Sequence, residues 1–126
     1  MIEIVLRQFR SGRERDAAMR RRPDAVFVSI AAYQGLNGIG RGGVFVEAGR
    51  PALTLALAML ARPGGLSTPD AIDLLYGWRL DGGPDNAREV VWQEKQRARL
   101  ALAAIGFYVE SCGRQGLSAA RPMAET

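Results

Sequence analysis

The chain has 126 residues, 48% of them apolar and 24% charged, a composition typical of one globular domain. It contains no histidine and a single cysteine, Cys112. These facts exclude a Ser–His or Cys–His catalytic pair, a histidine metal site and an intrachain disulfide. We therefore expect a cytoplasmic protein that is not an enzyme and that needs no metal or other cofactor.

The net charge of +4 is distributed unevenly along the chain. Residues 1–50 hold nine arginines against five acids, whereas residues 51–126 hold eight basic and eight acidic residues. All but one of the 17 basic residues are arginine, whose planar, forked guanidinium suits phosphates and base edges. The charge indicates an anionic partner, and nucleic acid is the commonest candidate.

The first 24 residues are predicted to be a basic N-terminal arm or a short helix. Ser11 and Glu14 have the spacing of a capping box, which predicts a helix over 12–22 that Pro23 ends. Within it, residues 20–22 are three arginines that could contact DNA as an arm or belong to a soluble linker. The apolar run 2–6 is too short for a signal peptide, and no apolar stretch is long enough to cross a membrane.

The next segment is predicted to form a small antiparallel sheet. Residues 25–30 and 44–47 are rich in β-branched and aromatic residues, and the glycine-rich stretch 35–43 between them is predicted to be a flexible turn. Residues 38–43 also spell G-x-G-x-x-G. Because a strand pattern rather than a helix follows them, they do not predict a dinucleotide site.

The remainder of the chain predicts three helices and a hairpin. The helices are expected over 51–62, 69–76 and 87–105, the last capped by Asn86 with Glu89. Strands over 107–111 and 117–119 flank a tight turn, and 120–126 are expected to be a flexible tail. This order predicts an α+β winged helix-turn-helix domain over 25–119, with a three-helix core, small N-terminal antiparallel strands and a C-terminal β-hairpin wing.

The residues from Val44 to Ser118 also resemble the OmpR/PhoB-type winged-helix DNA-binding domain of bacterial response regulators. The matching positions are Leu53-Thr54, Leu60–Gly65, Ala71–Gly77, Asp81–Asn86, Val90-Val91, Arg97, Arg99, Leu102, Ile105-Gly106, Val109–Ser111 and Gly116. The chain departs from the family at Lys95, where isoleucine is usual, at Ala98, where leucine is usual, and in the wing. Since only 50 residues precede the first matching helix, we expect no receiver domain and no phosphorelay control.

Helical geometry divides the segment 87–105 into faces. Val91, Ala98, Leu102 and Ile105 fall on one side and are predicted to face the core. A basic flank with an exposed aromatic residue and glutamines suits a helix that lies in the major groove of DNA. The predicted DNA-binding residues are Arg88, Trp92, Lys95, Gln96, Arg97 and Arg99, with Arg114 of the wing. Each of them is also compatible with a solvated side chain, and Trp92 equally with packing.

The leading hypothesis is that the protein binds double-stranded DNA and regulates transcription. The alternative is a winged helix repurposed for protein–protein contact, docking on RNA polymerase or on another regulator. The sequence leaves open whether the protein forms a homodimer. Cys112, in the expected hairpin, is interpreted as a small packed residue rather than a reactive thiol.

Overall fold

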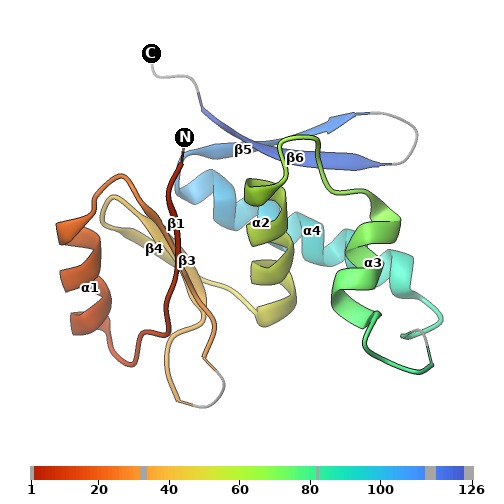
Figure 1. Ribbon diagram of the computed structural model, residues 1–126, viewed down its shortest axis with the longest axis horizontal. Coiled ribbons are helices and arrows are strands. Elements are labelled where there is room, and N and C mark those ends of the chain that lie inside the picture. The colour runs from red at the N-terminus through yellow and green to blue at the C-terminus, as the bar shows by residue number, and fades with distance from the viewer. Residues whose placement is uncertain (1, 32–33, 82, 113–115, 124–126) are drawn as a thin grey trace.

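The computed structural model describes residues 2–31, 34–81, 83–112 and 116–123, which form an α+β fold (Figure 1). The elements in chain order are β1 (Ile4–Leu6), α1 (Gly12–Arg21), β2 (Val26–Ser29), β3 (Gly38–Arg41), β4 (Val44–Glu47), α2 (Arg50–Ala61), α3 (Thr68–Tyr76), α4 (Ala87–Ala104), β5 (Phe107–Cys112) and β6 (Leu117–Pro122). None of these helices is both long enough and apolar enough to cross a membrane.

The first four strands form one mixed sheet in the order β1-β2-β3-β4. The small antiparallel sheet expected across 25–47 is present, but β3 lies between the two predicted strands, so β2 and β4 each pair with β3 and not with each other. Strand β1 pairs in parallel with β2. The apolar run at the N-terminus is therefore an edge strand, and helix α1 is the connection between two parallel strands. Residues 1–24 thus contain the short helix that was one of the two expectations for this segment, and α1 packs on the sheet.

The sheet separates two hydrophobic clusters. Val26 and Val28 of β2 pack with residues of α2 and α4, whereas Phe27 packs with Phe9 and with Met19 of α1. Adjacent side chains in a strand point to opposite faces, so this Val-Phe-Val alternation places apolar groups on both sides. Figure 1 shows the resulting layers, with α1 on one side of the sheet and α2 and α4 on the other.

The glycine-rich segment is ordered, and the expectation of a flexible turn over 35–43 was wrong. Residues 38–41 are strand β3, and only Gly42 and Gly43, both with positive φ, form the turn to β4. The phenyl ring of Phe45 lies over Gly38 and Gly40, where a Cβ atom would come within 2.6 and 2.8 Å of that ring. The glycines are thus explained by a close packing contact, and no helix follows them.

The helices begin within one residue of where the sequence placed them, with one difference in capping. Ser11 and Ser67 each accept a hydrogen bond from the backbone N–H three residues on, as N-caps do. Asn86 makes no such bond at the start of α4, so the predicted Asn86–Glu89 cap was wrong. The reason is the backbone of Asn86, which has φ −97° and ψ 32° rather than the extended conformation of a capping residue.

The C-terminal hairpin is longer than expected. Strand β6 continues to Pro122, so the residues from 120 that were expected to be part of a flexible tail extend the pairing with β5. Arg121 fixes this end, since its guanidinium binds the carboxylate of Glu110 and donates to the backbone oxygen of Pro63. Leu66 forms a bridge with Ser118 and adds a short third segment to the hairpin.

A methyl group at position 38 should destabilise the fold. Gly38→Ala is expected to lower the free energy of unfolding by about 1–3 kcal/mol, because its Cβ would collide with the backbone oxygen of Val46 as well as with Phe45. Chemical denaturation measures this change. Gly64→Ala is the control, since a Cβ there meets nothing within 4 Å. Equal effects of the two substitutions would contradict the packing account.

Candidate nucleic-acid interface

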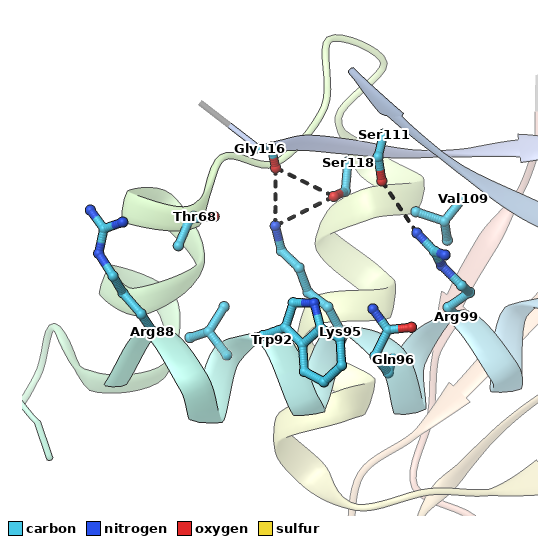
Figure 2. A pocket seen from close by; sticks show the side chains of 11 residues that line it. Thr68, Arg88, Trp92, Lys95, Gln96, Arg99, Val109, Ser111, Gly116 and Ser118 are labelled. Carbon is cyan, nitrogen blue, oxygen red and sulfur yellow. Dashed lines mark hydrogen bonds between the residues drawn. The ribbon is translucent and has the colours of Figure 1, made fainter. Parts of the chain in front are cut away.

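A groove of about 360 Å³ lies between α4 and the hairpin β5–β6, with the start of α3 at one end (Figure 2). Helix α4 supplies one wall and the hairpin the other. The lining residues are Thr68, Arg88, Val91, Trp92, Lys95, Gln96, Arg99, Val109, Ser111, Gly116 and Ser118. Three of these residues are cationic and none is acidic, so the groove is positively charged.

The faces of α4 follow the helical period. Val91, Ala98, Leu102 and Ile105 are buried, which confirms the predicted core face. Arg88, Trp92, Gln96 and Arg99 succeed one another at spacings of three or four residues, so they line one flank of the helix. Five of the residues predicted to bind DNA, these four and Lys95, therefore share one groove.

Lys95 joins the two walls of the groove. Its ammonium group donates to the backbone oxygens of Gly116 at 3.2 Å and Leu66 at 3.5 Å, and to Oγ of Ser118 at 3.4 Å. Figure 2 shows the side chain reaching from α4 to the hairpin. Partial burial lowers the pKa of Lys95 below its ordinary value. The ammonium group of Lys95 is therefore engaged with protein oxygens.

The other groove residues differ in how free their side chains are. Arg99 donates to Oγ of Ser111 at 3.2 Å, which directs its guanidinium towards the hairpin (Figure 2). Arg88 is exposed, and no ion pair is found for it among the described residues. Trp92 is 63% exposed, which means that packing does not account for this side chain. An exposed indole between cations offers a flat surface for a base or a sugar.

Arg97 lies apart from the five predicted residues that share the groove. Arg97 forms an ion pair with Glu94, which is only 8% exposed. It also borders a second hollow, which is lined by Val46–Gly49, Leu100 and Ala101. Helical spacing alone did not reveal that Glu94 would be buried and would pair with Arg97. Arg114 and the side chain of Cys112 lie outside the described residues.

The segment before α4 exposes apolar groups that were not among the predicted site residues. Trp78 and Leu80 are largely exposed, and Leu74 of α3 is partly so. Asp81 organises this segment, because it accepts from the backbone N–H of Gly83 and from the guanidinium of Arg79, and these contacts lower its pKa. In the sequence, these exposed groups could have been suspected from the apolar residues that continue from Leu74 past the end of α3 to Trp78 and Leu80.

Comparisons with protein-family models, with curated proteins and with solved structures find no significant match to this chain. Among the described residues, no group of three or more Cys, Asp or Glu side chains is placed to hold a metal ion. What the groove can do chemically therefore rests on its own residues: cations, an indole and one amide on a helix beside a hairpin.

Replacing Lys95 should loosen the hairpin. Lys95→Met removes a cation from three oxygen acceptors, so we expect the free energy of unfolding to fall by about 1–2 kcal/mol, measured by urea denaturation. Arg88→Met is the matched control, because it removes an exposed cation from the same groove and should change stability by less than about 0.5 kcal/mol. Equal losses in the two variants would contradict the bridging role.

The wild type and Lys95→Met also give a pH test. Because the pKa of Lys95 is lowered on folding, the unfolded chain binds more protons than the folded chain in alkaline buffer. The unfolding free energy of wild type minus that of Lys95→Met should therefore rise as the pH increases from about 8 to about 10. A difference that falls over this range would show that folding raises the pKa.

Proposed function

We propose that α2, α3, α4 and the hairpin β5–β6 form a winged helix-turn-helix that binds double-stranded DNA and regulates transcription. The observation that carries this proposal is the groove between α4 and the hairpin, which gathers three cations, an exposed indole and no carboxylate. The order of three helices followed by a hairpin, and the bridge from Leu66 to Ser118, support the same interpretation.

The dimensions of α4 suit the major groove of B-DNA. An 18-residue helix is roughly 27 Å long, and the major groove is wide enough to admit an α-helix. With α4 lying in that groove, Arg88 and Arg99 reach phosphates near the two ends of the flank, and Gln96 reaches base edges between them. Trp92 then contacts sugar or thymine methyl groups. Lys95 holds the hairpin against α4, so that the second wall can follow the adjacent backbone.

A specific observation favours a second candidate function, docking on another protein such as RNA polymerase or a second regulator. Trp78 and Leu80 are large apolar side chains that are exposed on the segment between α3 and α4. Exposed aromatic and aliphatic groups are common anchors of protein interfaces. Neither residue lines the groove, so the two functions can be separated by substitution.

The DNA-binding proposal is tested with Arg88→Gln/Arg99→Gln. Each lost phosphate contact should reduce the slope of log K against log salt by about 0.9, so the double variant should lose up to about 2 units of slope and at least about tenfold in affinity at low salt. Fluorescence anisotropy with a duplex of random sequence measures both. Arg97→Gln is the matched control because that guanidinium is paired with Glu94, and it should bind nearly as wild type does. Folded wild-type protein that binds no duplex at low salt would refute the proposal.

The docking candidate is tested with Trp78→Ala/Leu80→Ser. Both side chains are exposed, so this variant should fold and should bind duplex DNA as wild type does. If docking is the function, surface-plasmon-resonance binding to purified RNA polymerase should fall by about tenfold in this variant and persist in Arg88→Gln/Arg99→Gln. Binding of polymerase that survives the loss of both apolar groups would count against this candidate.

A further inference from the structure

The outer face of α1 carries a dense set of arginines. The helix buries Ala18 and Met19 against the sheet, so its apolar side faces the core and not solvent. Arg13, Arg20 and Arg21 are exposed on the remaining surface, and Arg10 is exposed immediately before the helix. Arg13 and Arg20 are seven residues apart, two turns of helix, and therefore share a face about 10 Å long.

The positive charge of this segment exceeds its negative charge, although Asp16 lies on the same side of α1 as Arg13 and Arg20. The two acids of the segment are already engaged, Glu14 with Arg7 and Asp16 with Arg15. Arg22 pairs with Glu3. No ion pair is found for the arginines at positions 10, 13, 20 and 21 among the described residues. Within the part of the chain that the structure describes, four guanidinium groups without an ion pair thus lie in one short segment.

This face and the groove lie on different sides of the molecule. Helix α1 packs on the Phe27 face of the sheet, whereas α4 packs on the Val26 and Val28 face. In Figure 1 α1 occupies one end of the long axis, and the hairpin and α3 extend towards the other. A rigid partner that fills the groove therefore leaves the outer face of α1 uncovered.

We propose that the outer face of α1 is a second, sequence-independent binding surface for nucleic-acid phosphates, through which one chain holds a second segment of duplex DNA. The inference rests on the proposed function for the groove, since bridging needs both surfaces. Backbone binding of DNA requires only exposed cations, and this face supplies them without an apolar contact.

Two other polyanionic partners fit this face less well. A helix that lies in a membrane interface needs a free apolar side to insert, and the apolar side of α1 is buried against the sheet. A protein interface needs apolar or aromatic anchors at its centre, and among the described residues of α1 no large apolar side chain is exposed. Duplex DNA is therefore the partner that the chemistry of this face favours.

The test is a bridging assay with the full chain. Two sets of duplexes, each about three helical turns long, carry a donor or an acceptor dye, and wild-type protein at low salt should bring them together and raise energy transfer. Arg13→Gln/Arg20→Gln should weaken bridging by about tenfold or more. Its affinity for a single duplex, which the groove provides, should change less than about threefold.

Controls separate this surface from net charge and from the groove. Arg50→Gln/Arg62→Gln removes the same charge from the ends of α2 and should bridge as wild type does. Arg88→Gln/Arg99→Gln should retain weak duplex binding at low salt through α1, and adding Arg13→Gln/Arg20→Gln should abolish it. Circular dichroism confirms that each variant folds.

Several outcomes would overturn the inference. Wild-type bridging that persists in Arg13→Gln/Arg20→Gln would assign it to a dimer of chains, and duplex binding without any bridging would leave α1 without this role. Binding to vesicles with about 30% phosphatidylserine that depends on Arg13 and Arg20, in the absence of bridging, would assign the face to membranes. If groove variants bind as wild type does while α1 variants do not bind, the proposed function of the groove fails. The α1 surface then binds DNA alone, and the bridging that was proposed fails with the groove.

Discussion

Strand β2 is buried along its whole length, between two neighbouring strands and two layers of helix. Val26 and Val28 face α2 and α4, and Phe27 faces α1, so one short strand holds the three layers together. At its end, the hydroxyl of Ser29 accepts from the N–H of Phe9 and donates to the backbone oxygen of Leu36. Both candidate surfaces depend on this strand, because it fixes the layer that carries α1 and the layer that carries α4.

Helix α4 has one side buried in the core and another exposed to solvent. Its buried side packs with α2, while one exposed flank forms a wall of the groove. Lys95 lies between these regions, and its ammonium group donates to backbone oxygens of the hairpin and of the segment before α3. A cation with a flexible stem can reach three oxygens that an isoleucine could not satisfy. The lysine at position 95 thus has a structural explanation within this chain.

Whether an arginine forms an ion pair indicates its role better than the total number of arginines does. Arg97 is matched by Glu94, Arg22 by Glu3 and Arg79 by Asp81. Among the described residues, guanidinium groups without such partners concentrate on the groove and on the outer face of α1. An arginine without an ion pair can bind an anionic partner without first giving up a contact, so these arginines are the most readily available ones.

The sequence by itself determined the α+β class, the start of each predicted helix and the buried face of α4, because these follow from local period, caps and breakers. It did not reveal β1 as a strand or β3 inside the glycine-rich segment, since a three-residue edge strand and glycines that fit under Phe45 acquire their conformation from neighbours. Only the tertiary structure decided how the candidate residues are grouped. It brought five of them into one groove, engaged Lys95 with the hairpin and placed Arg97 beside Glu94. Helical spacing indicates which residues share a side of one helix. Which side meets a hairpin, a buried acid or solvent depends on long-range packing, which no local pattern encodes.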